Sequence, residues 1–411
     1  MKILVFGGSG KMGSAVAWDL VQQVDVEQVG LLDRSKEGLA RVEAWINDPK
    51  LRRHCVDLMD RAATVAVMQQ YDVGVVTLPN RRLSYRVAEY AIEAGLNLVD
   101  ILEEYHRRPD AYEVEGLEIP AGMDLNAYGE DLHERLAAAG ITYLDGMGFA
   151  PGMSNLALGS GIDQLDATET AIARVGGVPD KPFADRHPLK YMVTWAFSHV
   201  LREYMVKVNV IKDGVTVEVD ALTERESFQF DACGVDESLE CAITPGMPSY
   251  LYTRPDLKEF AEKTIRWPGH FAAMDTLKSC GLLDLDPVEV DGQQVVPRKL
   301  LLALIQPRLK PAKDEGDVCI MWTSAEGTKD GRRARVDSYL WDRADRAHGI
   351  TSMARVTGFS AAIGALFVGR GLVQGHGIVA PEDAIRGETY LRFRKELELR
   401  DIRIEERMQL L

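Results

Sequence analysis

The fold is decided by the first thirteen residues, MKILVFGGSGKMG at 1–13, in which the apolar run 3–6 leads directly into a glycine-rich turn and then a helical pattern. Gly8, Gly10 and Gly13 match GxGxxG, while Gly7, Gly10 and Gly13 match GxxGxxG. Such a turn lets the backbone approach a pyrophosphate held at the helix N-terminus. The stretch predicts a Rossmann dinucleotide-binding domain and leaves the register of the glycines open.

Asp33 lies 20 residues after Gly13, at the end of the second apolar run. A carboxylate there accepts hydrogen bonds from ribose hydroxyls and repels a 2′-phosphate, whereas the basic neighbours Arg34 and Lys36 attract one. The sequence therefore favours NAD and leaves NADP possible. Asp57 is compatible both with an adenine contact and with an exposed loop. The predicted cofactor-binding residues are Gly7, Gly8, Ser9, Gly10, Lys11, Met12, Asp33, Arg34, Asp57, Leu78 and Pro79.

Short apolar runs alternate with amphipathic segments through the first 150 residues, as in βαβ units whose parallel sheet is covered on both faces. Six such strands fit a doubly wound parallel sheet. The predicted strands lie at 3–6, 29–32, around Val56, 73–78, 96–99 and 141–144.

The rhythm changes after Asn155 to longer alternating runs joined by tight turns. The Asp213-Gly214 pair separates two runs of alternating valines, which predicts a β-hairpin, and two further Asp-Gly pairs begin at Asp291 and Asp330. We expect an inserted α+β domain with a mainly antiparallel sheet, followed from Thr351 by a helical segment that returns to the first domain. The predicted domains are 1–155, 156–345 and 346–411.

The composition narrows the function classes. The formal net charge of −15 is unfavourable for binding nucleic acid or an anionic membrane. The apolar stretches at 146–162 and 356–369 fall short of an uninterrupted bilayer span of about 20 residues, so no membrane partner is expected. Five cysteines without metal-ligand spacing suit reduced thiols, and no zinc or Walker motif is present. We predict a cytoplasmic protein whose glycine-rich turn binds a dinucleotide that takes part in hydride transfer.

Several segments in order resemble the saccharopine dehydrogenase family, most closely its lysine 6-dehydrogenase branch. They are the opening 2–13, AGIT at 139–142 leading into GFAPGM at 148–153, GGVP at 176–179, KTIRWPGH at 263–270 and MAR at 353–355. The resemblance covers nearly the whole chain. It implies a Rossmann domain, an inserted domain that shapes the substrate pocket and carries a homodimer contact, and a C-terminal segment returning to the first domain.

The same resemblance implies an activity. The family oxidises or forms a carbon–nitrogen bond on an amino acid with a nicotinamide cofactor, and in the lysine branch the ε-amine becomes an imine that hydrolyses and cyclises. One departure separates the branches: saccharopine reductases and carboxynorspermidine enzymes usually carry Asp-Pro-Gly where this chain has Ala150-Pro151-Gly152. The missing carboxylate favours a primary amine substrate, or a different placement of the proton-transfer group.

Amine oxidation needs a group that accepts a proton. Asp100 ends the predicted fifth strand and opens the acidic run DILEE at 100–104, so it is the leading candidate, although aspartate at this place is also a favoured helix cap. His270 is the second catalytic candidate because of its near-neutral pKa, although a lone histidine is commonly structural.

A substrate carboxylate needs a cation. Arg266, within the TIRW segment, has the fork geometry that suits a carboxylate; its alternative role is a salt bridge within the second domain. Lys190 and Tyr191 lie in a segment that enters the pocket of relatives, and Trp195 offers a stacking surface. Ordinary core or surface roles stay open for these three residues.

The primary prediction is an NAD(P)-dependent dehydrogenase for a side-chain amine of an amino acid, with L-lysine 6-dehydrogenase activity. One alternative is a saccharopine-like or carboxynorspermidine-like reductase that joins an aldehyde to an amine. The other is a non-catalytic dinucleotide sensor. The presence of Arg266 and of strand-end carboxylates favours an enzyme over the sensor.

Overall fold

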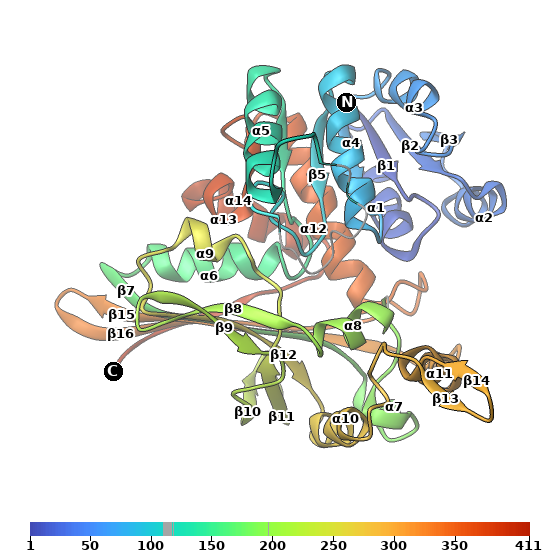
Figure 1. The fold of residues 1–411 in the computed structure, drawn as a ribbon. Coiled ribbons are helices and arrows are strands. Elements are labelled where there is room, and N and C mark those ends of the chain that lie inside the picture. Colours follow the sequence, from blue (N-terminus) through green and yellow to red (C-terminus); the bar gives the residue numbers. More distant parts are fainter. Residues whose placement is uncertain (110–116, 118, 196) are drawn as a thin grey trace. The chain divides into compact units, whose positions relative to one another are not determined.

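The computed structural model describes residues 1–109, 117, 119–195 and 197–411, which divide into two compact units (Figure 1). Unit 1 comprises Met1–Asp163, Gly246–Pro255 and Ala354–Ile402. Unit 2 comprises Gln164–Pro245, Asp256–Met353 and Arg403–Leu411. Each unit contains its own large β-sheet.

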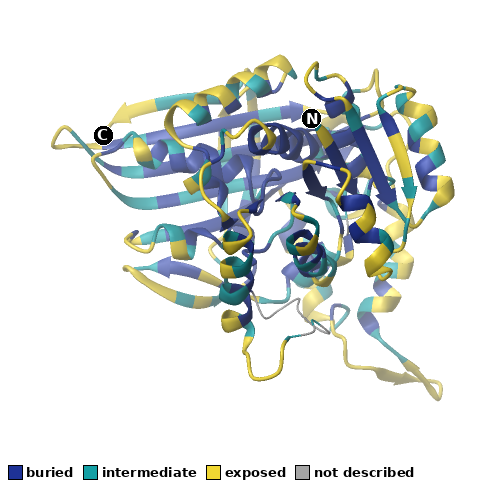
Figure 2. Cartoon of the chain, turned by 90° about the horizontal axis from the view of Figure 1, so that it is seen from above, coloured by how far each residue is buried: buried dark blue, intermediate teal, exposed yellow. Residues whose placement is uncertain are grey.

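Unit 1 contains a seven-stranded sheet in the order β17-β6-β5-β4-β1-β2-β3, in which every neighbouring pair is parallel. Its strands are buried apart from the edge strand β3 (Figure 2). The predicted Rossmann sheet is confirmed, and a seventh strand, β17, joins it from the C-terminal segment. The strands are β1 (Lys2–Phe6), β2 (Gln28–Asp33), β3 (Leu51–Cys55), β4 (Val73–Val76), β5 (Asn97–Asp100), β6 (Thr142–Leu144) and β17 (Gly377–Val379).

Helices cover both faces of this sheet. Successive residues of a strand point to opposite sides, and here both sides are apolar and buried by helices. Leu98 and Tyr143 share a hydrophobic core with α3, α4 and α5, whereas their neighbours Val99 and Leu144 lie against Gly364 of α12. Side chains of Ser35, Asp60, Asn80 and Asp124 cap α2, α3, α4 and α5. The helices are α1 (Lys11–Val21), α2 (Lys36–Ile46), α3 (Arg61–Met68), α4 (Arg81–Ala94), α5 (Leu125–Ala138), α6 (Met153–Asp163), α9 (Tyr250–Thr253), α12 (Ser352–Gly369), α13 (Pro381–Ala384) and α14 (Gly387–Leu399).

α12 is the one helix among the described residues that is long and apolar enough to span a membrane, and 89% of it is buried inside the structure. Its Phe359 stacks on Trp18 of α1 at a centroid distance of 5.8 Å. A Cβ at Gly358 would lie 3.1 Å from the Ala15 side chain, so the glycine at this position allows α12 to pack closely on α1. Burial of this kind is typical of a core helix.

Unit 2 contains a nine-stranded sheet with the main order β10-β11-β12-β7-β15-β16-β18, and the β8–β9 hairpin joins it at β12. Only the β12–β7 pair is parallel, so the predicted, mainly antiparallel sheet is confirmed. The strands are β7 (Ala167–Pro179), β8 (Lys207–Lys212), β9 (Val215–Asp220), β10 (Glu226–Ala232), β11 (Val235–Ile243), β12 (Glu259–Arg266), β15 (Asp317–Lys329), β16 (Arg332–Arg343) and β18 (Glu405–Leu410).

All three predicted Asp-Gly turns form. Asp213, Asp291 and Asp330 have φ between 48° and 50°, and the glycine after each also has a positive φ, which suits two-residue hairpin turns. The second turn connects a separate small hairpin, β13 (Val288–Val290) and β14 (Gln293–Val295). The remaining elements of unit 2 are α7 (Lys181–Ala184), η2 (Pro188–Lys190), α8 (Phe197–Glu203), α10 (His270–Ser279), α11 (Pro297–Ile305) and η3 (Gln306–Arg308).

The two units divide the chain differently from the predicted domains: the main changes of unit fall after residues 163 and 353, and two further segments belong to the other unit. Residues 246–255 belong to unit 1, where the Tyr250 hydroxyl donates to the Asn155 carbonyl and Arg254 pairs with Asp383 at 2.7 Å. Residues 403–411 belong to unit 2 because β18 pairs with β16. Neither segment carries a composition change that marks the crossing.

Candidate active site

The glycine-rich turn forms the first part of the site. Gly7 has a φ of 74°, and its carbonyl accepts a hydrogen bond from the Gly10 amide at 2.9 Å. A Cβ on Gly13 would lie 2.4 Å from that carbonyl oxygen, which an L side chain cannot tolerate. Because Gly7, Gly10 and Gly13 contact one another, the geometry favours the GxxGxxG register. Gly8 packs against Leu31 instead, with a hypothetical Cβ 3.0 Å from that side chain.

The N-terminus of α1 suits a pyrophosphate. The first helical hydrogen bond of α1 runs from the Ser14 amide to the Gly10 carbonyl, so the preceding amides are available at the positive end of the helix dipole. A Cβ on Gly10 would meet only the Gly7 carbonyl oxygen, at 3.2 Å, so space exists beside the turn. Lys11 and Met12 begin the helix, as predicted, with Lys11 exposed.

Asp33 is fixed beside this turn. Its Oδ2 accepts hydrogen bonds from the Ser9 hydroxyl at 2.7 Å and the Ser9 amide at 3.2 Å, while Oδ1 accepts from the Ser35 amide at 2.9 Å. Arg34 is exposed next to it, and Arg41 donates to the Ser9 carbonyl at 3.1 Å. The acid predicted to meet a ribose therefore lies at the glycine-rich turn. These residues fit a dinucleotide.

The other predicted cofactor residues differ in their surroundings. Leu78 lies against the turn, with its Cδ2 3.4 Å from a Cβ placed on Gly7, and Pro79 follows it in an exposed position. Asp57 is exposed, and its Oδ1 accepts a hydrogen bond from the Met59 amide at 2.9 Å within its own loop. The structure thus brings Leu78 to Gly7 and shows no contact between Asp57 and the turn.

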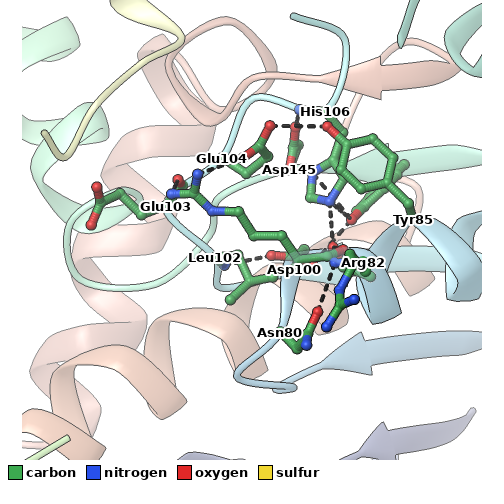
Figure 3. Close-up of polar contacts among 12 residues, drawn as sticks. Asn80, Arg82, Tyr85, Asp100, Leu102, Glu103, Glu104, His106 and Asp145 are labelled. Atoms are coloured by element: carbon green, nitrogen blue, oxygen red, sulfur yellow. Dashed lines mark hydrogen bonds and ion pairs between the residues drawn. The ribbon is translucent and has the colours of Figure 1, made fainter. Parts of the chain in front are cut away.

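Asp100 ends β5 inside a buried polar cluster rather than on an open edge (Figure 3). Its Oδ2 accepts a hydrogen bond from the Tyr143 hydroxyl at 3.0 Å, and its Oδ1 accepts one from the Leu102 amide. Burial raises the pKa of Asp100 to about 7; the nearby Asp145 carboxylate also raises it, while His106 opposes the shift. This carboxyl group therefore titrates near neutral pH, although its side chain contacts no solvent.

His106 and Asp145 complete the cluster and were not among the predicted site residues. His106 Nδ1 lies 2.7 Å from Asp145 Oδ1, and the His106 amide donates to Asp145 Oδ2 at 2.7 Å. Burial lowers the pKa of His106, but the Asp145 and Asp100 carboxylates outweigh it and raise the pKa to about 9. The sequence signal that could have found them is the histidine shortly after the strand that ends at Asp100, together with a second acid, Asp145, at the end of the neighbouring strand.

A neutral ion pair borders the cluster. Arg81 Nη1 of α4 lies 2.9 Å from Glu104 Oε2, and the Tyr85 hydroxyl donates to Glu104 Oε1 at 2.9 Å. Both charged side chains are buried. Glu104 of the predicted acidic run is therefore bound to Arg81 and Tyr85, and Arg81 also donates to the Glu103 carbonyl.

Unit 2 contains a buried arginine at the end of β12. Arg266 Nε donates to the Tyr204 hydroxyl at 2.9 Å, Nη1 donates to the Ile265 carbonyl at 2.8 Å, and the guanidinium lies 5.2 Å from the Tyr191 ring centroid. Among the described residues no carboxylate forms an ion pair with it. A buried cation without a counter-ion is costly unless a ligand supplies the charge.

His270 supports this arginine. Its Nδ1 lies 2.8 Å from the Leu189 carbonyl and must donate, so Nε2, 3.1 Å from the Tyr204 hydroxyl, accepts from it in the neutral ring. Burial, aided by the charge of Arg266, lowers the pKa of His270 to about 3. His270 is thus neutral, and the chain His270–Tyr204–Arg266 orients the guanidinium.

The remaining predicted substrate-binding residues, Tyr191, Lys190 and Trp195, differ in their surroundings. Tyr191 is fully buried beside Arg266, whereas Lys190 is partly exposed with its Nζ 3.7 Å from Asp185. Lys190 lines a surface hollow of about 320 Å³ together with Trp267 and Lys181. Trp195 stacks on His199 at a centroid distance of 6.4 Å. Of the three, Tyr191 is the residue that packs against the arginine in the described part of the chain.

The GGVP segment allows β7 to approach β12 near this arginine. A Cβ on Gly176 would lie 2.4 Å from the Ile265 carbonyl oxygen, the atom next to Arg266 in the chain, and one on Gly177 would lie 2.5 Å from Met353. Larger residues would displace the strand that carries Arg266. Among the described residues no group of three His, Cys, Asp or Glu side chains could hold a metal ion.

Comparisons with known proteins match both parts of the chain. Residues 3–144 match the saccharopine dehydrogenase NADP binding domain, and residues 148–402 match the saccharopine dehydrogenase C-terminal domain. Carboxyaminopropylagmatine dehydrogenase from Synechocystis sp. is 22% identical over 394 residues, covering 93% of this chain and 92% of that protein. The apo structure of saccharopine dehydrogenase (L-Glu forming) from Saccharomyces cerevisiae covers 99% of both chains with a TM-score of 0.78 and 20% identity.

Proposed function

Since the chain belongs to the saccharopine dehydrogenase family, we propose that it oxidises a side-chain amine of an amino acid, with L-lysine as the leading candidate. It is an NAD(P)-dependent oxidoreductase that acts on amine-containing substrates. The observation that carries this proposal is the buried Arg266, whose guanidinium has no ion-pair partner among the described residues. The α-carboxylate of an amino acid is the anion that such a fork accepts.

The proposed reaction gives a role to several of the candidate residues. A bound nicotinamide dinucleotide supplies the hydride acceptor. The amine carbon loses a hydride and the nitrogen a proton, giving an imine that water hydrolyses to an aldehyde and ammonia. Arg266, oriented by Tyr204 and His270, holds the substrate carboxylate; Tyr191 packs beside the guanidinium. We propose Asp100, whose Oδ2 accepts the hydrogen bond of the Tyr143 hydroxyl, as the final acceptor of the proton.

A second candidate reaction joins two molecules. The similarity to carboxyaminopropylagmatine dehydrogenase favours an enzyme that condenses an aldehyde with an amine and reduces the imine, or oxidises the joined product. Ala150 supplies no carboxylate for a secondary amine in the turn after β6, which favours the primary amine instead.

The deciding experiment is a substrate panel. The protein is mixed with NAD or NADP and with lysine, ornithine, diamines or saccharopine at pH about 9–10, where the lysine ε-amine is substantially neutral. Absorbance of the reduced cofactor is expected to rise with lysine. Reduction of NAD with saccharopine alone, or consumption of NADPH by an aldehyde with an amine, selects the second candidate. Dinucleotide binding without turnover in either direction selects the sensor.

The cofactor preference is tested at Asp33. We propose that NAD is preferred because the Asp33 carboxylate repels a 2′-phosphate. Asp33→Asn removes the charge and keeps one acceptor oxygen, which can serve the Ser9 or the Ser35 hydrogen bonds but not both. The ratio of kcat/KM for NAD over NADP should fall about tenfold, equivalent to about 1.4 kcal/mol. Asp286→Asn, at an exposed acid of unit 2, is the control and should leave the ratio unchanged. An unchanged ratio in D33N would remove Asp33 from cofactor selection.

Two properties stay predictions from the sequence. We propose a homodimer formed through the inserted domain, and a cytoplasmic location in keeping with five free cysteines. Light scattering behind a sizing column should give twice the chain mass of 45.6 kDa. A mass of one chain would contradict the dimer.

A further inference from the structure

His106 lies between two hydrogen-bond partners in the buried cluster (Figure 3). On one side, Nδ1 faces the Asp145 carboxylate at 2.7 Å. On the other, Nε2 lies 2.6 Å from the Ser84 hydroxyl, which also lies 2.6 Å from the Arg81 carbonyl. When the serine hydrogen goes to that carbonyl, the hydroxyl oxygen accepts from Nε2, and the ring carries a hydrogen on each nitrogen. The geometry thus accommodates the imidazolium form, and the Asp145 and Asp100 carboxylates favour it.

The Tyr143 hydroxyl links this ring to Asp100. Its oxygen lies 3.3 Å from His106 Nε2, and its hydrogen goes to Asp100 Oδ2 at 3.0 Å. Tyr143 therefore presents an acceptor to the ring and a donor to the carboxylate. All of these side chains are buried, so water does not screen the charges between them.

The ionisation of Asp100 depends on the charge of the His106 ring. Among the described residues, the groups that face the cluster come from α4 (Arg81, Ser84 and Tyr85), from the segment after β5 (Glu104 and His106), and from β6 and its end (Tyr143 and Asp145). Arg81 pairs with Glu104. Within this described set, the two carboxylates Asp100 and Asp145 then share the positive charge of His106.

We infer that His106 is a positioning residue for the proposed reaction: clamped as an imidazolium by Asp145 and Ser84, it holds Asp100 as the carboxylate that can accept a proton. The inference rests on the proposed role of Asp100. It is consistent with a pKa of about 9 for His106 and about 7 for Asp100. Without the positive charge, Asp100 would keep its proton to higher pH and would be unavailable as an acceptor in neutral solution.

The test replaces the charge and keeps a hydrogen bond. In His106→Asn the side-chain amide can still donate to Asp145 but carries no charge. With ¹³C-labelled aspartate carboxyl groups, and the Asp100 signal assigned by its absence in D100N, Asp100 should titrate near pH 7 in the parent protein. In H106N its midpoint should rise by about one to three pH units, the usual effect of removing a close opposite charge. His376→Asn, at an exposed histidine of the same unit, should leave it unchanged.

Catalysis should follow the same midpoint. Because the ionised carboxylate accepts the proton, the rate of amine oxidation falls as the pH drops through the Asp100 midpoint, and in H106N this fall should begin at correspondingly higher pH. A residue that only stabilises the fold would lower the amount of folded protein and leave the midpoint in place. An unchanged Asp100 midpoint in H106N would overturn the inference.

A second measurement needs no variant and no substrate. Labelling of histidine ring nitrogens with ¹⁵N should show His106 protonated on both nitrogens at pH 7, whether or not H106N folds. A neutral ring at that pH would overturn the inference. Failure of the substrate panel would instead refute the proposed function, and it would not alter either nuclear magnetic resonance result.

Discussion

Arg266→Met should lower kcat/KM for the amino-acid substrate by roughly 30- to 5,000-fold, which corresponds to the about 2–5 kcal/mol lost when one partner of a buried charged pair is removed. The guanidinium is buried, oriented by Tyr204, and free of ion pairs with described residues, so the substrate carboxylate is its proposed counter-ion. Kinetics with lysine and with the matching diamine, which lacks the carboxylate, should show the loss only for lysine.

The thermal stability of the R266M variant distinguishes substrate binding by Arg266 from a structural role. A buried arginine without a carboxylate partner weakens the free protein, so a methionine of similar length should leave Tm unchanged or raise it. Arg343→Met is the matched control, because that guanidinium also lies over an aromatic ring, Trp341 at 5.8 Å, but is exposed. It should leave kcat/KM unchanged. Equal losses for lysine and the diamine in R266M would argue against carboxylate binding.

Gly13→Ala should weaken dinucleotide binding by roughly 5- to 150-fold, from the about 1–3 kcal/mol that overpacking of a tight contact costs. The new Cβ would lie 2.4 Å from the Gly7 carbonyl oxygen and 2.7 Å from Thr77 Oγ1, so α1 must move away from the turn. The amides at the start of α1 would then leave the position in which they meet a pyrophosphate. Titration calorimetry with NAD measures the change.

Two other glycines provide the comparison. Gly10→Ala meets only the Gly7 carbonyl oxygen, at 3.2 Å, so Tm should fall less than in G13A, while the added methyl group still obstructs the approach of a pyrophosphate. Gly316→Ala in unit 2 has no neighbour closer than 3.4 Å and should leave dinucleotide binding unchanged. Parental affinity in G13A would mean that the turn is not the dinucleotide site.

Hydrophobic periodicity predicted most of the sheets but not their edges. Buried strands such as β1 and β4 are continuous apolar runs, and Asp-Gly pairs in the sequence indicate the three hairpin turns. β3 reads LRRHC because an edge strand is largely exposed, so its place was only approximated around Val56. β17 has three residues and pairs with β6 across more than 230 positions of sequence, a contact that local patterns do not encode.

The site was predictable in part for the same reason. The glycine-rich turn and Asp33 belong to one local motif, and the structure places them together. His106, Asp145, Tyr143 and Ser84 come from three separate segments, and their chemistry arises only when the ends of β5 and β6 meet α4. Asp100 and Arg266 were predicted from their residue type and their place in the sequence, whereas the enclosure of Asp100 depends on packing that a linear pattern does not record.

The chain crosses between its two units five times, after residues 163, 245, 255, 353 and 402. Neither half is a continuous stretch of the gene, so no single pair of primers amplifies a self-sufficient cofactor-binding or substrate-binding module. Recombination at one crossover would exchange fragments of both units at once. Directed evolution of such a protein is therefore best carried out on the full-length gene.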